Sequence, residues 1–400
     1  MNESALAFAE MQGLYGSYTF SEHLLQKIWL RGEFDRRAAM TVAGARVTII
    51  HPGRLNRLGG PDFRDARLRL GDGAEVTGDV EVHLNAADWE AHRHAEDPAY
   101  DRVILHVVLF PPKPGRVTRD SQGREVPVLA LLTLLHHDLE EFAEEEAVDR
   151  MAARPGGKIF NALGGLPLPE IEVRLRQHAE TRWRRKIHFA RIRIEKLGWE
   201  GACHQGILEI LGFRFNRAPM LRLGGLFPLE DWASGTLTAE GLIASEAGAW
   251  SVQGVRPANQ PRTRLGQYLG WASLRPRWPQ AWADMATDWP EVPAGLTTTS
   301  ARKAYRFSRL RVRVGEEVCG QTVGGSRFET SMTDGLLPLA AARFSKEEAL
   351  FGSWVHWFHG DLPTGIPEAL RDLGVTGSSG KPVSNGLGQG LLGWLSGRGE

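Results

Sequence analysis

The chain has 400 residues, 42% of them hydrophobic and 24% charged, so it is long enough for two globular domains and unlike disordered or fibrous proteins. Lysine plus arginine and aspartate plus glutamate both number 48, and this balance excludes a bulk attraction to nucleic acid or to an anionic membrane. The two cysteines, Cys203 and Cys319, lie far apart, which excludes a disulfide framework and a cysteine-based zinc finger.

The first residues carry Glu3 and Glu10 and lack the basic start and apolar stretch of a secretory signal. The most apolar short run, 103–110, contains His106 and is far too short to span a bilayer. We therefore expect a cytoplasmic protein with no membrane partner.

The N-terminal third shows one helix followed by strands. The capping-box pattern from Thr19 to Glu22 and apolar residues at helical spacing predict a helix that ends near Gly32. Alternating or β-branched runs predict strands over 45–50, 66–70, 76–84 and 103–110, and Gly71-Asp72-Gly73 predicts a turn between the second and third strands. This order indicates an α/β domain over 1–135, with a mixed sheet flanked by helices.

The remainder of the chain reads as mostly helical. The run 128–135 is apolar and fits a strand or a helix, and 136–169 combines seven acidic residues with a Gly/Pro-rich stretch, which predicts an acidic helix and a linker. We expect a basic helical region over 170–255 and a mainly helical region over 256–400 that ends in a Gly-rich tail. We find no repeat of 20 to 50 residues.

Candidate catalytic residues concentrate between 59 and 106. Side chains alternate along a strand, so Asp79, Glu81 and His83 share one face of the strand 76–84. Asp62 follows Pro61 in the loop before an earlier strand. Converging carboxylates of this kind bind Mg²⁺ or Mn²⁺, which activates water for phosphodiester hydrolysis, and His83 would orient or deprotonate that water.

The order of helix, strand, Pro61-Asp62, Glu81-x-His83 and apolar strand resembles the core of the PD-(D/E)XK nuclease superfamily. The resemblance implies that Asp62 and Glu81 bind the metal, that His83 takes the place of the lysine that positions the water, and that Glu22 is the helical acid of some members. A neutral histidine supplies less fixed positive charge than lysine.

A second resemblance covers nearly the whole chain. The segments LQKIW, GRLNRLGGPDF, GDVEVH, DWEAHRH, DPAYDRVILHVV, RPANQPRTRL and NGLGQGLL are similar to those of the bacterial family called domain of unknown function 2851. This resemblance implies a family and no reaction.

Other interpretations of the same residues remain open. Asp62 also suits a turn, Glu22 a capping box, and the alternating face of Asp79, Glu81 and His83 an exposed edge strand. Imidazole suits zinc or iron, so a transition-metal site could be built from His83 and further candidate ligands. These are His92 and His94, which also fit a solvated loop, and His106, which also fits a core histidine.

The segment 171–196 carries nine Lys or Arg against three Glu, with aromatic and apolar residues between them. Its basic cluster could follow the phosphates of nucleic acid, or it could pair with the acidic run 138–149. Thirteen tryptophans fit core positions better than base stacking. The cluster consists of Arg182, Arg184, Arg185 and Lys186.

The sequence thus favours a Mg²⁺- or Mn²⁺-dependent phosphodiesterase that acts on DNA or RNA. One alternative is a non-catalytic scaffold for nucleic acid or protein that retains a nuclease-like fold. The other is a histidine-rich transition-metal hydrolase.

Overall fold

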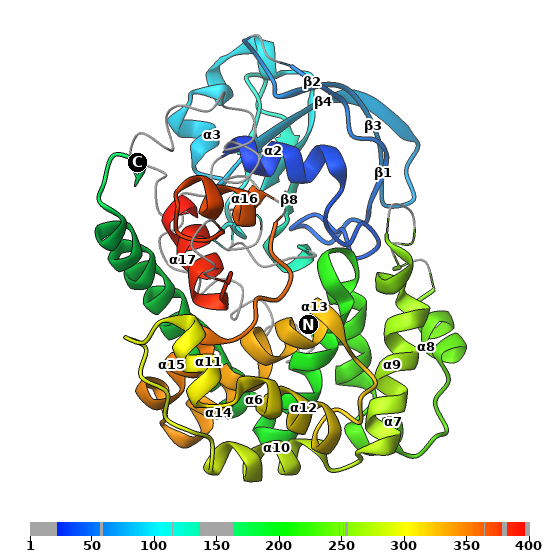
Figure 1. Ribbon diagram of the computed structural model, residues 1–400. Coiled ribbons are helices and arrows are strands. Elements are labelled where there is room, and N and C mark those ends of the chain that lie inside the picture. Colours follow the sequence, from blue (N-terminus) through cyan, green and yellow to red (C-terminus); the bar gives the residue numbers. More distant parts are fainter. Residues whose placement is uncertain are drawn as a thin grey trace. The chain divides into compact units, whose positions relative to one another are not determined.

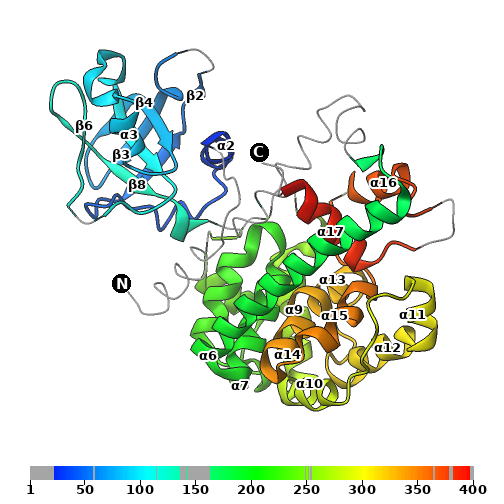
Figure 2. The ribbon, with the colours of Figure 1, turned by 90° about the vertical axis from the view of Figure 1, so that its left-hand side faces the viewer.

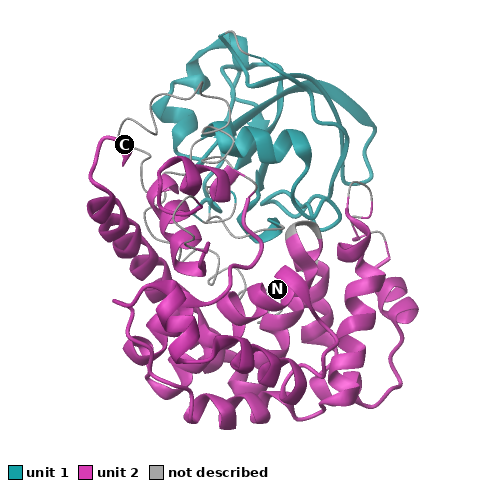
Figure 3. Ribbon diagram, viewed as in Figure 1, with its two compact units in different colours: residues 1–143 teal, residues 144–400 magenta. Residues whose placement is uncertain are grey.

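The chain forms two compact units, residues 1–143 and 144–400, in a computed structural model (Figure 3). The division falls within 136–169, in its acidic part and before its Gly/Pro-rich stretch, where we expect the linker. The structure describes residues 22–56, 59–113, 115–135, 142, 163–247, 249–250, 252, 255–363, 365–377 and 382–396.

The first unit is built on a mixed sheet, in which the strands follow the order β1-β3-β4-β5-β8, with β2 paired to β3 (Figure 1). The pairs β1–β3 and β3–β4 are antiparallel, whereas β4–β5 and β5–β8 are parallel. The strands are β1 (Val47–His51), β2 (Arg54–Leu55), β3 (Phe63–Leu70), β4 (Glu75–His83), β5 (Val103–Val108) and β8 (Val128–Ala130). The expected fold class of a mixed sheet with flanking helices is confirmed.

One face of this sheet forms an apolar core with helix α2 (Glu22–Arg31). Leu25 and Ile28 of the helix are fully buried in the same cluster as Val80 and Val82 of β4. The helix ends where Gly32 adopts a positive φ of 65°, as the sequence predicts. Because side chains alternate along β4, burial of its valines on this face turns Glu81 and His83 to the other face.

Parallel strands need a crossover connection, and the one between β4 and β5 lies on the face of Glu81 and His83. It contains the short helix α3 (Asp88–Ala91) and the 3₁₀ turns η1 (His94–Glu96) and η2 (Pro98–Tyr100). The loop after β5 adds a hairpin of β6 (Thr118–Arg119) and β7 (Glu125–Val126), and the turn η3 (Leu132–Leu134) follows β8. The sheet therefore brings a histidine-containing connection over its central strand.

The second unit is helical, as expected. Its longest element, α6 (Leu168–Leu226), is interrupted by non-helical backbone at Gly198, Phe213 and Asn216. The other elements are α7 (Leu229–Ala233), α8 (Ala239–Ser245), η4 (Pro257–Asn259), α9 (Pro261–Leu274), α10 (Trp278–Thr287), α11 (Thr298–Ala304), α12 (Phe307–Glu317), α13 (Gly325–Thr330), the π-helical turn η5 (Ser331–Leu336), α14 (Leu337–Phe344), α15 (Glu347–His356), α16 (Gly365–Asp372) and α17 (Asn385–Ser396).

Tryptophans hold the core of this unit together, which confirms the core interpretation of these residues. Trp232, Trp271, Trp282 and Trp354 are each 0% exposed. The Trp271 indole donates to the Val318 carbonyl and the Trp282 indole to the Leu336 carbonyl, so the polar edges of these rings are satisfied inside the core.

The Gly-rich end of the chain differs from the expected tail. Residues 385–396 form α17, which packs against α6 (Figure 2). Its glycines permit this close approach, because a side chain at Gly390 would meet the Leu175 carbonyl. The acidic run 138–149 lies outside the described residues except for Phe142. Among the described helices, none combines the length and the apolar character needed to cross a membrane.

Candidate metal centre

The two functional candidates on β4 are buried in the middle of the sheet. Glu81 is 5% exposed and His83 is 1% exposed. Because β4 pairs with β3 on one side and β5 on the other, the interpretation of an exposed edge strand is wrong. A buried carboxylate and imidazole on a central strand need partners from elsewhere in the fold.

The crossover supplies these partners. One ligand nitrogen from each of His83, His92 and His94 lies within 4.8 Å of the other two. His83 Nε2 is 3.1 Å from His92 Nδ1, and Glu81 Oε1 is 3.4 Å from His83 Nε2 and 3.3 Å from His94 Nε2. Three imidazoles thus converge on one place, and the Glu81 carboxylate lies beside two of them, His83 and His94.

The bonding of His94 provides a test of whether a metal fits these residues. Its Nε2 is buried and has no hydrogen-bond partner among the described residues, because the nearby Glu81 oxygen is close without being aligned for a hydrogen bond. A buried, unsatisfied imidazole nitrogen is costly unless it binds something. Lone pairs of imidazole and carboxylate that converge in this way match the ligand set of a divalent transition metal.

A buried chain of contacts through His106 and Thr118, called the relay below, orients the His83 ring. His83 Nδ1 is 3.0 Å from His106 Nε2, and His106 Nδ1 is 3.2 Å from Thr118 Oγ1. His106 is therefore a buried histidine with partners at both ring nitrogens, as the core interpretation expects, and it is not a member of the cluster of His83, His92 and His94. Outer partners of this kind fix the ring orientation and tautomer of a metal ligand.

Aromatic rings form one wall of the centre. The Tyr100 ring stacks on His94 with a centroid distance of 3.7 Å, and the Trp89 ring meets His94 edge-on at 5.4 Å. The Trp89 indole donates to the Arg119 carbonyl. These contacts restrict the His94 ring and exclude water from its buried side. His92 lies on the exposed side.

Asp62 lies beside Glu81, just before β3, and is held by several hydrogen bonds. Its backbone N–H donates to Glu81 Oε2 at 2.9 Å, its Oδ1 accepts from Gln26 at 2.8 Å, and its Oδ2 accepts from the Val82 N–H at 3.2 Å. The structure thus brings Asp62, Glu81 and His83 together, as the sequence predicts. The three-histidine cluster does not include Asp62.

The electrostatics of the centre follow from burial. Burial, followed by the negative charge of Glu81, raises the pKa of Asp62 to about 7. Burial, followed by His94 and His92, lowers the pKa of His83 to about 3, so its imidazole stays neutral at pH 7. Burial, followed by the charge of Glu81, raises the pKa of Tyr100 to about 12. Neutral imidazole is the form that binds metal.

Glu22 belongs to the surroundings of the centre. Its pKa is raised chiefly by burial, and His92, Asp88 and Glu81 all act on its charge. Glu22 begins α2, but the rest of its predicted capping box lies outside the described residues. The half-buried Glu22 therefore stands near the exposed His92.

Asp79 has a different partner, although it shares its strand with Glu81. It is 4% exposed, and its Oδ1 accepts a hydrogen bond from the Asp65 N–H at 3.1 Å. The register of β3 against β4 shifts between Phe63 and Ala66, and Asp65 has a φ of 56°. Asp79 thus satisfies the backbone of a β-bulge, which its position in the sequence could not reveal.

The basic cluster on α6 is largely engaged within the second unit. Arg182 is 4% exposed and donates through Nε to Gln389, and Lys186 lies 3.0 Å from Asp334. Arg184 pairs with Glu180 on the same helix, and burial lowers the pKa of Arg185. The cluster is therefore a weak candidate for contacting phosphates. The partner expected for self-pairing, the run 138–149, lies mostly outside the described residues.

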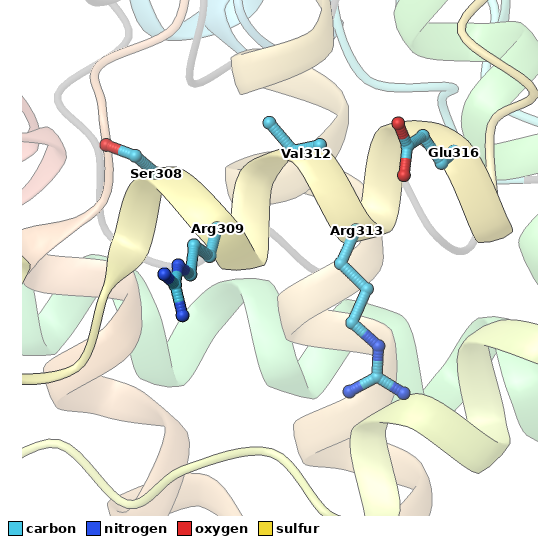
Figure 4. A pocket seen from close by; sticks show the side chains of 5 residues that line it. All are labelled: Ser308, Arg309, Val312, Arg313 and Glu316. Atoms are coloured by element: carbon cyan, nitrogen blue, oxygen red, sulfur yellow. The ribbon is translucent and has the colours of Figure 1, made fainter.

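A pocket on α12 offers no comparable chemistry. It is lined by Ser308, Arg309, Val312, Arg313 and Glu316 (Figure 4). Its lining has a single carboxylate and no histidine, and Arg313 is already paired with Glu317. This pocket therefore adds no set of metal ligands to the one in the first unit.

Three residues of the site were not predicted. Gln26 lies one helical turn after Glu22, a spacing that could have indicated a shared face. No sequence pattern indicated a role for Thr118 or Tyr100. Thr118 lies in a Pro/Gly-rich loop and Tyr100 in a 3₁₀ turn, where residue spacing does not fix the direction of a side chain.

Comparisons with known proteins identify a family for this chain. The family described as Protein of unknown function (DUF2851) matches residues 22–248, more than half of the chain, which confirms the family; the segments RPANQPRTRL and NGLGQGLL lie beyond the match. No curated protein and no solved structure matches. The likeness to the nuclease superfamily therefore stays a prediction.

Proposed function

The chain belongs to the DUF2851 family, and we propose that it is a transition-metal-dependent hydrolase of phosphodiesters, with its metal centre at Glu81, His83, His92 and His94. The observation that carries this proposal is the convergence of three imidazoles, one of which has a buried nitrogen without a partner among the described residues, beside the buried carboxylate of Glu81. The proposal joins two interpretations of the sequence, the metal-dependent phosphodiesterase and the histidine-rich hydrolase.

The donor set favours Mn²⁺ or Zn²⁺ over Mg²⁺. Mg²⁺ prefers oxygen ligands and keeps several waters, whereas three of the four candidate ligands are imidazoles. Imidazole suits zinc, iron and related ions, and Mn²⁺ also accepts carboxylates. His83 and His94 would bind through Nε2, His92 through Nδ1 and Glu81 through Oε1.

Other residues of the chain supply the remaining parts of the proposed reaction. A bound ion would polarise a phosphoryl oxygen and make water a better nucleophile at neutral pH. Asp62, held beside Glu81 by Gln26 and Val82, takes the proton of the attacking water. His106 and Thr118 hold the His83 ring, and Tyr100 holds the His94 ring.

The phosphodiester class is supported by the order of the residues in the fold. An acid that precedes β3 and a Glu-x-His pair on the central β4 match the arrangement that the nuclease resemblance implies, and Asp62 and Glu81 are in contact. Nucleic acid is the substrate that this resemblance implies. The alternative of a scaffold that binds through Arg182 and Lys186 is disfavoured, because both side chains have partners within the fold.

Metal binding is the first test. Purified chain freed of metal should bind one Mn²⁺ or Zn²⁺ per molecule in a calorimetric titration, and His94→Ala should weaken binding by about 100-fold. The exposed His188, on α6 in the other unit, provides the matched control, and His188→Ala should bind as the unchanged chain does. Failure of the unchanged chain to bind either ion would refute the centre.

Turnover is the second test. Linear DNA and RNA incubated with the Mn²⁺-loaded protein should be cleaved, and Asp62→Asn should reduce the rate about 100-fold or more while it retains the metal. Glu81→Gln should lose both metal affinity and rate. Full metal binding without cleavage of either nucleic acid would refute the reaction and leave the centre intact.

A further inference from the structure

The second unit contains a buried arginine whose surroundings call for a ligand. Arg264 lies in the first turns of α9, in the segment RPANQPRTRL, and is only 6% exposed. Arginine stays protonated in proteins, so this side chain carries a positive charge away from water. A buried charge needs a counter-charge or a complete set of hydrogen bonds.

Arg264 has neither within the described parts of the chain. Its Nη1 donates to Gln267 Oε1 at 2.8 Å and its Nη2 to Asn259 Oδ1 at 2.5 Å, and both acceptors are neutral amides. Its Nε is buried and has no hydrogen-bond partner. No carboxylate of a described residue lies within ion-pair distance of this guanidinium.

A second buried arginine adds to the positive charge. Arg327 is 4% exposed, and its charge acts on Arg264 together with the opposing charge of Asp361. Asp361 is engaged elsewhere: it lies 2.9 Å from Arg327 and accepts hydrogen bonds from Ser326 and Thr330. The carboxylate of Asp361 therefore acts on two buried guanidinium groups. It is paired with Arg327 and lies beyond ion-pair distance of Arg264.

Two amide oxygens each accept from one Nη of Arg264, and the Nε–H is left as a buried donor without a partner among the described residues. Because arginine has no acceptor, Asn259 and Gln267 must turn their amide oxygens toward it, which leaves their NH₂ groups for other partners. Both residues are half-buried. A buried guanidinium with an N–H that lacks a partner and no carboxylate at ion-pair distance is suited to an oxyanion.

We propose that Arg264, with Asn259 and Gln267, forms a binding site for a phosphate-type oxyanion in the second unit. The Nε donor would bind one oxygen, and the positive charge shared with Arg327 would stabilise the anion. Phosphate forms strong, charge-assisted hydrogen bonds with a guanidinium, which suits the remaining donor of Arg264. This site is independent of the metal centre.

The test measures stabilisation of the full chain by inorganic phosphate. Thermal unfolding is followed by tryptophan fluorescence, to which the second unit contributes eleven of the thirteen tryptophans. A chelator removes metals, and chloride holds the ionic strength constant. Phosphate at about 20 mM should raise the unfolding midpoint by about 4 °C, and Arg264→Met should reduce that rise to below about 1 °C.

Matched variants and ligands make the result specific. Arg262, exposed on the same helix and paired with Glu240, provides the control, and Arg262→Met should keep the full rise. If Arg264→Met does not fold, Arg264→Lys replaces it and should reduce the rise by half or more. An equal rise in the Arg264 variant, no rise in the unchanged chain, or an equal rise with acetate would overturn the proposal.

A second ligand distinguishes free phosphate from a phosphorylated organic molecule as the occupant of the site. Adenosine monophosphate that matches the effect of phosphate at a tenfold lower concentration would assign the site to a phosphorylated organic molecule. Equal potency would assign it to the phosphate group alone. Both results support the proposed chemistry, and they distinguish its two sources.

Discussion

His106 illustrates how a buried core residue can also support the proposed metal centre. It is 0% exposed, and its Nε2 contacts His83 Nδ1. Burial, followed by the charges of His83 and His94, lowers the pKa of His106 far below its usual value. A neutral ring is able to accept from one neighbour and donate to the other, so His106 connects Thr118 to His83 as a positioning residue.

Replacing His106 should weaken metal binding without unfolding the sheet. We expect His106→Leu to lower the affinity for Mn²⁺ or Zn²⁺ by about 10- to 100-fold, since the His83 ring would lose its orienting partner. Calorimetric titration gives the affinity, and urea unfolding of the metal-free protein reports any general damage. Thr118→Val, which removes only the far end of the relay, should give a smaller loss. Unchanged affinity in His106→Leu would show that the relay does not orient the ligand.

At the scale of single elements, the sequence alone predicts one helix and four strands of the first unit. Helix α2 and strands β1, β3, β4 and β5 were expected close to their observed positions, because each combines a clear apolar period with a Gly or Pro boundary. The shared face of Glu81 and His83 followed from strand alternation alone.

What escaped prediction depends on contacts between distant segments. The bulge that engages Asp79 arises from the register of β3 against β4, and the approach of His92 and His94 to His83 arises from the path of the crossover. Neither register nor loop path is encoded in local periodicity. The glycines of α17 appeared to mark a tail, because a Gly-rich composition does not distinguish flexibility from close helix packing.

The packing of α17 on α6 predicts opposite effects for two glycines. A Cβ at Gly390 would lie 2.2 Å from the Leu175 carbonyl oxygen, whereas a Cβ at Gly266 in α9 would meet nothing within 4 Å. Gly390→Ala should therefore lower the free energy of unfolding by about 1–3 kcal/mol or more, and Gly266→Ala should raise it by up to about 1 kcal/mol. Urea unfolding measures both. Equal changes of the same sign would contradict this packing.

At the scale of the whole molecule, the second unit depends on polar groups buried among its aromatic rings. His204, 2% exposed, lies with its Nδ1 2.7 Å from the Tyr268 hydroxyl and its Nε2 3.0 Å from the Phe227 carbonyl. Nε2–H must donate to the carbonyl, so Nδ1 accepts from the hydroxyl and the ring is neutral. Burial lowers the pKa of His204 to about 4.

This pKa predicts a loss of stability in acid. The unfolded chain binds a proton at His204 near its ordinary pKa of about 6.5, whereas the folded chain does so only near 4, so stability falls as the pH drops between these values. The contribution is at most about 3 kcal/mol. In urea unfolding followed by tryptophan fluorescence between about pH 7 and pH 4, His204→Gln should show a shallower pH dependence, by about one proton. An identical slope in both proteins would contradict this assignment.

The crossover between β4 and β5 has a consequence for the lifetime of the first unit. Since His92 and His94 lie on the connection between two parallel strands, the candidate ligands come together only when β4 and β5 have paired. An ion captured there would act on the native state and hardly at all on the folding transition state. It would slow unfolding and leave the folding rate nearly unchanged. The lifetime of the folded first unit would then increase with the concentration of free metal.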